Sequence, residues 1–264
     1  MIDSNEILPI FRISREGKQD TEDLVTREIP LTVILNSKDL VTLLCSPIDL
    51  KYLAIGFLSS EGLINSKDEV RKVMVNDQRG EVRVETKGYR ESLKLFPGKR
   101  LVTSGGGRGA YFRHPANVEK RGKVESRFRI SADQILALVK QFQHQSQIYR
   151  TTGGVHSAAL CDERSILVFS EDIGRHNAID KIFGKCVLEG ISMDNRIIIT
   201  SGRISSEIVL KVTKREIPIL VSKSAPTNLG VKLASNLGIT LLGFVREDRM
   251  NVYTGRWRII SDGE

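Results

Sequence analysis

Apolar and polar residues alternate along four stretches in the first third of the chain, as they do in half-buried strands. These stretches are Ile7 to Ile13, Leu31 to Leu35, Val70 to Val75 and Val82 to Glu85. Apolar residues recur at helical spacing between Leu50 and Leu58. Ser46 and Pro47, which precede that stretch, suit the N-cap and first turn of a helix. The pattern predicts a strand-rich region that contains one helix.

In the second half, short apolar strands alternate with helical patterns. Ser131 and Gln134 form a capping box that opens a helix to about Gln145. Strands are predicted at 165–169, 196–200, 217–221, 239–245 and 250–254, and helices after Gly174, from 204 to about 215 and from 227 to about 237. This alternation predicts an α/β fold, a mostly parallel sheet with helices on both faces.

A glycine-rich run, Ser104 to Gly109, separates the two patterns and is followed by a basic stretch with few periodic apolar residues. We therefore predict a boundary near 115–130, with a strand-rich N-terminal domain at 1–125 and an α/β domain at 126–264. The run lacks the Gly-Lys-Ser/Thr ending of a nucleotide phosphate loop. We expect a mobile loop over 104–109 instead.

Residues suited to ligand binding collect at the ends of the predicted strands. The densest group, Glu171 to Lys181, places six ionisable side chains around Gly174, where a strand passes into a helix. The other junctions are 151–157, 201–203, 223–228 and 246–249. Each carries a glycine, a hydroxyl or an arginine, which offer N–H groups and guanidinium forks to phosphate. Because parallel strands end at one edge of a sheet, a phosphate-bearing ligand is predicted there.

Each of these residues also has a purely structural explanation. The glycines can simply permit tight turns, and Ser201, Ser205 and Thr227 can cap helices. A hydrogen-bonded core histidine explains His156 as well as a ligand contact does. Asp180 and Lys181 can be solvated helix charges. The joint occurrence of several such junctions at one edge favours the site.

Composition limits the class of ligand and the setting. The net charge is +8, but the basic residues are dispersed and aromatic residues make up only 6% of the 264 residues. Nucleic acid is therefore not the expected partner, because RNA-binding surfaces interleave basic and aromatic residues. The chain start does not resemble a signal peptide, and no apolar run reaches the ~18 residues of a spanning helix. We expect a cytoplasmic protein without a membrane segment, whose three cysteines are free thiols.

Four blocks of the sequence are distinctive when taken together, namely Thr152–Ala158, Glu171–Lys181, Thr200–Glu207, and Gly243–Arg246 together with Asn251–Tyr253. These blocks resemble the FdhD/NarQ family of formate dehydrogenase accessory proteins. The resemblance implies a cytidine-deaminase-like α/β fold and a homodimer. It also implies a sulfur carrier, or sulfurtransferase, that takes persulfide sulfur from a cysteine desulfurase. The sulfur passes to the molybdenum (or tungsten) bis(molybdopterin guanine dinucleotide) cofactor before the cofactor enters formate dehydrogenase.

The resemblance also places cofactor contacts on one segment, which comprises Phe244, Val245, Arg246, Glu247, Asp248 and Arg249. Arg246 and Arg249 suit a diphosphate or a guanine edge. Location and chemistry alone predict further contacts at His156, Asp172, Arg175, His176, Ser201 and Arg203. GDP is expected to mimic part of the cofactor. No catalytic residue and no metal ligand is predicted.

The chain departs from the family where the sulfur would be carried. Family members typically have one or two cysteines, often as Cys-x-x-Cys, in a glycine-rich loop after Thr-Ser. Here Thr103 and Ser104 are followed by Gly-Gly-Gly-Arg-Gly. Sulfur relay needs a thiolate nucleophile. Cys161, beside charged Asp162, is expected near the surface, whereas Cys186 lies on an apolar helix stripe. We hypothesise retained cofactor binding with weak or absent sulfur transfer.

Two alternatives belong to other functional classes. A zinc deaminase on the same fold needs His-x-Glu and a cysteine pair, but the chain has alanine at position 158 and no Cys-x-x-Cys. That reading is disfavoured. A guanine-nucleotide or RNA binding module remains as the second alternative.

Overall fold

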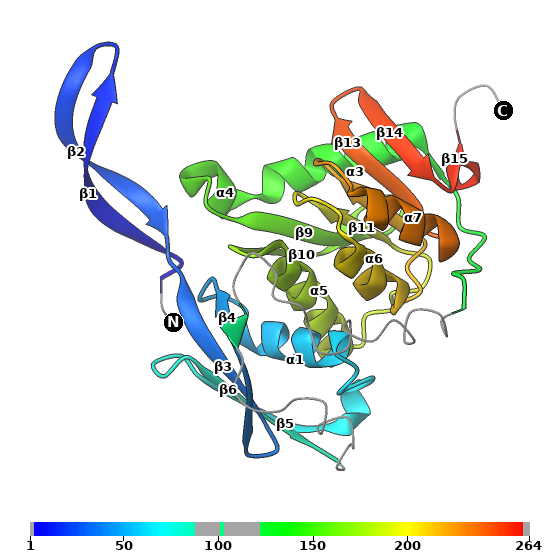
Figure 1. The fold of residues 1–264 in the computed structure, drawn as a ribbon, viewed down its shortest axis with the longest axis horizontal. Coiled ribbons are helices and arrows are strands. Elements are labelled where there is room, and N and C mark those ends of the chain that lie inside the picture. The colour runs from blue at the N-terminus through cyan, green and yellow to red at the C-terminus, as the bar shows by residue number, and fades with distance from the viewer. Residues whose placement is uncertain (1–2, 88–100, 103–121, 261–264) are drawn as a thin grey trace.

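The computed structural model describes residues 3–87, 101–102 and 122–260. They form a small N-terminal sheet and a larger α/β unit, with a long hairpin that projects from both (Figure 1). The predicted 104–109 loop lies outside the described residues, and the predicted division at residue 125 stays a prediction. No helix among the described residues is both long and apolar enough to cross a membrane.

The N-terminal sheet has five strands in the order β5-β6-β3-β4-β7. Their bounds are β3 Ile29–Leu35, β4 Lys38–Cys45, β5 Val70–Asn76, β6 Glu81–Thr86 and β7 Leu101–Val102. Alternate residues of β3 and β6 are buried against helix α1 (Leu50–Ser60), which supplies Leu53 and Leu58 to this core. A 3₁₀ turn, Lys67–Glu69, precedes β5. The strands predicted here are confirmed, whereas β4 and β7 were not predicted.

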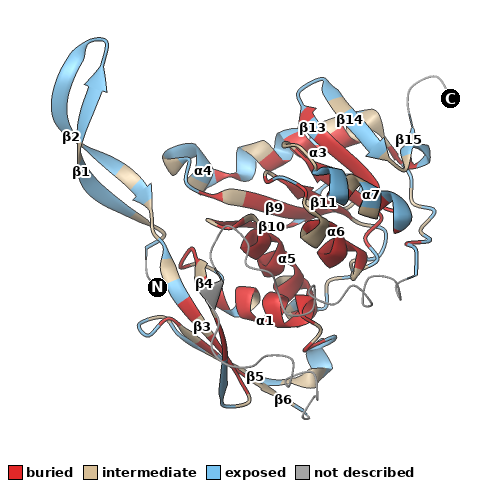
Figure 2. Ribbon diagram, in the orientation of Figure 1, coloured by how far each residue is buried: buried red, intermediate tan, exposed pale blue. Residues whose placement is uncertain are grey.

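The projecting hairpin pairs β1 (Asn5–Ser14) with β2 (Gly17–Thr26) in antiparallel register. Its side chains are mostly exposed, and the hairpin stands clear of both sheets in Figure 2. The alternation at 7–13 predicted β1. Strand β2 was not predicted, because three carboxylates among its ten residues hide any apolar alternation.

The start predicted for α1 was wrong. The helix begins at Leu50 after Asp49, which has left-handed backbone geometry with φ 56°. Ser46 does not cap it, because its hydroxyl accepts a hydrogen bond from Ile173 N at 3.1 Å. The backbone N–H of Ser46 donates to Asp172 Oδ2, also at 3.1 Å. A residue expected to begin a helix therefore connects the two parts of the molecule.

The larger sheet has six strands in the order β10-β9-β11-β12-β13-β14. Their bounds are β9 His156–Cys161, β10 Ile166–Asp172, β11 Ile197–Thr200, β12 Ile219–Ser222, β13 Thr240–Arg246 and β14 Arg249–Thr254. Helices α5 (Arg175–Glu189), α6 (Ser206–Thr213) and α7 (Asn228–Asn236) cover one face. The other face packs against α3 (Ala132–Gln145), with the short pair β8 (Ile130–Ser131) and β15 (Ile259–Ile260) beside it. Helices on both faces are confirmed.

The expectation of a mostly parallel sheet was wrong. Within this sheet only β11–β12 and β12–β13 pair in parallel, and the remaining three pairs are antiparallel. The connections 162–165 and 247–248 are too short for a crossover, so each must reverse the chain direction. The reversals nevertheless return the start of β9 and the end of β10 to the edge where β11, β12 and β13 end. The predicted meeting of strand ends at one edge is therefore present.

The helix predictions in this half are largely confirmed. Both hydrogen bonds of the capping box between Ser131 and Gln134 are made. Helix α5 ends at Gly190, whose φ of 70° gives the left-handed C-cap. Thr227 caps α7 by accepting a hydrogen bond from Gly230 N. A 3₁₀ turn, Arg256–Arg258, precedes β15.

Helices α1 and α5 pack at unusually close range. A β-carbon at Gly56 would lie 1.7 Å from the carbonyl oxygen of Asp180, and one at Gly184 would lie 1.9 Å from that of Tyr52. The two backbones therefore touch where both helices carry glycine. Asp180 is buried rather than solvated, and it accepts hydrogen bonds from Ser60 Oγ at 2.6 Å and from Lys211 Nζ.

Candidate functional site

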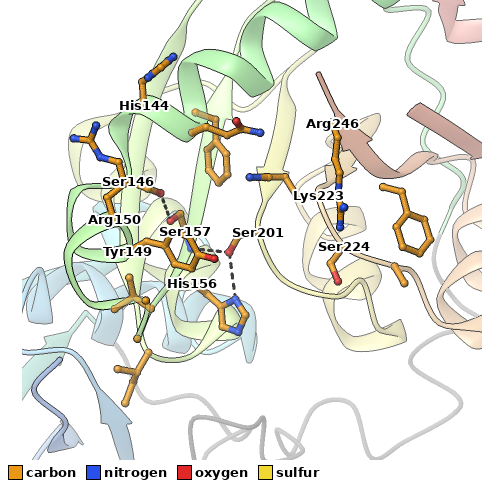
Figure 3. A pocket seen from close by; sticks show the side chains of 18 of the residues that line it. His144, Ser146, Tyr149, Arg150, His156, Ser157, Ser201, Lys223, Ser224 and Arg246 are labelled. Carbon is orange, nitrogen blue, oxygen red and sulfur yellow. Dashed lines mark hydrogen bonds between the residues drawn. The ribbon is translucent and has the colours of Figure 1, made fainter. Parts of the chain in front are cut away.

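A pocket of about 970 Å³ opens at the sheet edge where the predicted junctions meet. One wall is built from α4 (Gln147–Thr152) and the start of β9, and the other from the segments that follow β12 and end β13 (Figure 3). A volume of this size is at the upper end of the range for small-molecule sites.

Two cations stand close together on the second wall. Lys223 follows β12, and Arg246 ends β13. Burial lowers the pKa of Lys223, and the charge of Arg246 lowers it further. Among the residues that the structure describes, no carboxylate lies within ion-pair distance of either side chain. Two neighbouring positive charges without a counter-charge favour binding of an anion.

His156 and Ser201 lie together at the first wall. Ser201 Oγ accepts a hydrogen bond from Ser157 N at 3.0 Å and lies 3.2 Å from His156 Nδ1. Burial lowers the pKa of His156, and the nearby Arg175 and Arg203 lower it further. The lowered pKa favours the neutral imidazole at pH 7. Ser201 Oγ can donate its own proton to His156 Nδ1 while it accepts from Ser157 N, and in that tautomer Nε2–H is the donor of the ring.

Glu171 fixes the position of α4 from inside the protein. Its buried carboxylate accepts hydrogen bonds from the N–H groups of Ile148 at 3.2 Å and Tyr149 at 3.3 Å. Ser157 Oγ also donates to it at 3.4 Å and lies 2.5 Å from Ser146 Oγ. A carboxylate at the start of a helix satisfies free N–H groups there. Through these contacts the strand ends hold α4 against the pocket.

Asp172 has a different environment from the other predicted contacts. It is 0% exposed and accepts hydrogen bonds from Gly174 N and Asn177 Nδ2, each at 2.8 Å, and from Ser46 N. Its Oδ2 also lies 2.7 Å from Lys181 Nζ, which is itself buried. Buried charges are tolerated when they are paired and hydrogen-bonded. We therefore assign Asp172 to the frame that shapes the turn rather than to ligand contact.

Five of the predicted contacts line the pocket, namely His156, Ser201, Phe244, Arg246 and Glu247. Phe244 is 37% exposed and has a φ of 53°, a backbone conformation that residues other than glycine rarely adopt. Its N–H donates to Ser224 O at 3.1 Å, which ties the two segments of this wall together.

The other predicted contacts do not line the pocket. Val245 is fully buried in the core, while Asp248 and Arg249 are exposed beyond it on the same hairpin. Arg175 and Arg203 lie near enough to His156 for their charges to lower its pKa, but neither lines the pocket. His176 is buried, with Nε2 3.3 Å from Glu207 Oε2, and burial is the main cause that lowers its pKa.

The residues that sequence reasoning missed come mainly from α4 and the turn after β12. They are His144, Ser146, Tyr149, Arg150, Ser157, Lys223 and Ser224. The predicted junctions at 151–157 and 223–228 had included Ser157, Lys223 and Ser224. No pattern predicted α4 as a helix, because six residues are too few for a periodic pattern.

All three cysteines are buried. Cys45 and Cys161 are 0% exposed and Cys186 is 1% exposed, and burial raises the pKa of each thiol to about 12. The expectation that Cys161 lies near the surface was wrong, because it points into the core from β9 and only its neighbour Asp162 reaches solvent. None of the three thiols has the exposure or the low pKa of a reactive thiolate.

The fold and the pocket define a mixed α/β protein with a cation-lined cavity at one edge of its large sheet. The chain belongs to the FdhD/NarQ family, whose sequence profile matches residues 26–260. It is 43% identical over 246 residues to the sulfur carrier protein FdhD of Bacillus pumilus (strain SAFR-032), with 93% of this chain and 94% of that protein covered. It is 41% identical over 250 residues to the protein of that name from Bacillus subtilis (strain 168), with 95% of each covered.

A solved structure agrees. The crystal structure of a formate dehydrogenase accessory protein from Desulfotalea psychrophila matches with a TM-score of 0.80 at 27% identity. The match covers 98% of this chain and 100% of the other. The resemblance inferred from the four sequence blocks is thereby confirmed.

Proposed function

We propose that this protein is a formate dehydrogenase accessory protein that holds the molybdenum bis(molybdopterin guanine dinucleotide) as cargo in the pocket. The observation that carries the proposal is the Lys223–Arg246 pair, two cations without a carboxylate partner on one wall of a large pocket. A diphosphate bridge offers the paired negative charge that such a site lacks. The names of the relatives, which describe sulfur carriers and a formate dehydrogenase accessory protein, support the same role.

The rest of the lining suits the other polar parts of the same ligand. His156 and Arg150, on the opposite wall, can donate hydrogen bonds, and Glu247, beside Arg246, supplies a carboxylate able to accept from a guanine edge. Tyr149, which is 52% exposed, and Phe244 offer aromatic rings for stacking on a base. The residues present therefore fit a phosphorylated dinucleotide.

We further propose that this chain does not relay sulfur through a cysteine of its own. Every cysteine of the chain is buried, with its thiol pKa raised to about 12. Persulfide exchange needs a thiolate that the donor can reach. Binding and delivery of the cargo remain as the role, and any sulfur that reaches the cargo comes directly from a persulfide on another protein.

Calorimetric titration with GDP, with the pterin dinucleotide and with a short RNA tests the binding role. We expect tight binding of the pterin dinucleotide, weaker binding of GDP and negligible binding of RNA. Arg246→Ala should weaken GDP binding by about 1.5 to 3 kcal/mol, as expected for a charge-assisted hydrogen bond. Arg249→Ala, on the same hairpin but outside the pocket, is the matched control. Equal effects of the two variants, or a preference for RNA, would contradict the proposal.

A further inference from the structure

The β1–β2 hairpin, here called the arm, has two faces of different character. Each strand is ten residues long, so the arm extends about 34 Å. One face carries Ile7, Pro9, Phe11 and Ile13 on β1, with Leu24, Glu22, Asp20 and Lys18 directly opposite them on β2. We call this face, on which Lys18 near the tip is the one cation of the two strands, the acidic–apolar face. Ile7 and Ile13, at 61% and 67% exposure, are the two most exposed large apolar side chains among the described residues.

On the opposite face of the arm, charged side chains form ion pairs. Arg12 pairs with Asp23 at 3.6 Å, and Arg27, just after the arm, pairs with Glu6 at 3.3 Å. On the acidic–apolar face, by contrast, no cation of the described residues lies within ion-pair distance of Asp20 or Glu22. An isolated two-stranded hairpin is only marginally stable in water. An exposed apolar row beside carboxylates that form no ion pair is typical of an interaction surface.

The charge of the arm indicates the kind of surface that it fits. Residues 5–26 carry five acidic and three basic side chains, a net charge of −2, in a chain whose net charge is +8. Pro9 removes one N–H from β1, and charged side chains follow one another along β2, so neither edge is suited to adding another strand. The complementary partner therefore presents an apolar patch bordered by lysine or arginine, and it docks on a face of the arm.

The base of the arm is attached to the rim of the pocket. Thr26 Oγ1, at the end of β2, is 2.7 Å from Thr152 Oγ1, at the end of α4. Gly154, which lines the pocket, lies so close that a β-carbon there would be 2.6 Å from Thr26 Oγ1. A protein held along the arm would therefore lie next to the pocket mouth, as Figure 1 shows for the arm and α4.

We propose that the acidic–apolar face docks the apoprotein that receives the cargo, the apo-formate dehydrogenase, through an apolar patch with a basic border. This inference rests on the proposed function, because it assigns the receiving partner of the same pocket. Binding at the arm would keep the recipient beside the cargo during transfer, which raises its effective concentration at the pocket.

Affinity measurements with purified apo-formate dehydrogenase of the same organism test the proposal. The test variant is Ile7→Ser/Phe11→Ser/Ile13→Ser, and its matched control is Leu8→Ser/Val25→Ser on the opposite face. We expect the triple variant to bind the dehydrogenase at least about tenfold more weakly and the control to bind as the wild type does. Asp20→Lys/Glu22→Lys, which changes only exposed charges, should also weaken binding and reduce its salt dependence.

Three outcomes would overturn the proposal. One is a wild-type protein that does not bind the dehydrogenase, and another is a triple variant that binds it normally. The third is a triple variant that changes from dimer to monomer in light scattering with unchanged dehydrogenase affinity, since the face would then belong to a second copy. GDP titrations of each variant separate the two proposals. If the wild type binds the dehydrogenase but not GDP, the pocket proposal is refuted. If the triple variant binds both GDP and the dehydrogenase as the wild type does, the arm proposal is refuted.

Discussion

Ser46 and Asp172 hold each other across the junction between the two sheets. Ser46 N donates to the Asp172 carboxylate, and Ile173, the residue after that aspartate, donates to Ser46 Oγ. The turn into α5 is thus built partly by a residue 126 positions earlier in the chain. Because Ile173 lines the pocket, this N-terminal residue contributes directly to the shape of the pocket edge.

Asp172→Asn should therefore destabilise the whole fold. The substitution leaves Lys181, which is 1% exposed, as a buried charge with a weakened partner. Loss of one member of a buried pair costs about 3 to 5 kcal/mol. Urea unfolding measures the change, with exposed Asp248→Asn as the control. The double variant Asp172→Asn/Lys181→Met should recover part of the loss. If Asp172→Asn alone were as stable as the wild type, the buried ion pair would not contribute to stability.

The contact between α1 and α5 gives a second prediction. Gly184→Ala would place a methyl 1.9 Å from Tyr52 O, so the two helices must separate. We expect a loss of about 2 to 3 kcal/mol, larger than the ~1 kcal/mol that alanine gains in helix propensity. Gly122→Ala, whose methyl meets no atom within 4 Å, is the matched control in thermal unfolding. An unchanged Tm for Gly184→Ala would show that the helices can move apart freely.

His156 should report on the ligand directly. In the free protein its pKa lies below 6.5, chiefly because of burial and then because of the nearby arginines. A bound polyanion stabilises the imidazolium, so GDP should move the pKa upward. NMR titration of the imidazole, with His156→Gln to assign the resonance, measures both values. A pKa that falls or stays unchanged on binding would place the phosphates away from this wall.

The two histidines with lowered pKa values also predict how stability depends on pH. His156 and His176 both have a folded-state pKa below 6.5, so the unfolded chain binds protons that the folded chain does not. Their contribution to stability is complete above pH 6.5 and is lost as the pH falls from there through the folded-state values. Urea midpoints measured between pH 8 and pH 5 should fall, and His176→Gln should reduce the slope. A pH-independent midpoint would contradict the burial of these rings.

Incubation with a cysteine desulfurase and free cysteine tests the sulfur chemistry. We expect mass spectrometry to find no persulfide on Cys45, Cys161 or Cys186 of the folded protein, because none is accessible. Urea-unfolded protein, in which the thiols are exposed, is the positive control for detection. A persulfide on any of them under native conditions would restore sulfur relay as a function of this chain.

Local sequence patterns predicted most of the helices and strands, and also the edge of the sheet where the strand ends meet. They failed where contacts between distant residues determine the structure. The capping box at Ser131 and the stripe on α5 are determined within a few residues, so both were predictable. Ser46 looked like an N-cap, and only its distant partner Asp172 changes its role. The direction of β9 relative to β10 depends on the short connection at 162–165, and the spacing of apolar residues does not reveal strand direction. In the site, Arg246 was predictable from its position, whereas the burial of Val245 beside it depends on the core that it enters.

The burial of the cysteines makes the protein suitable for site-specific fluorescent labelling. A folded protein that offers no reactive thiol can receive a single engineered cysteine without background labelling, since maleimide dyes react with exposed thiolates. One dye at the tip of the arm, for example at Gln19, and another on a candidate partner would show by energy transfer whether the two approach each other during delivery.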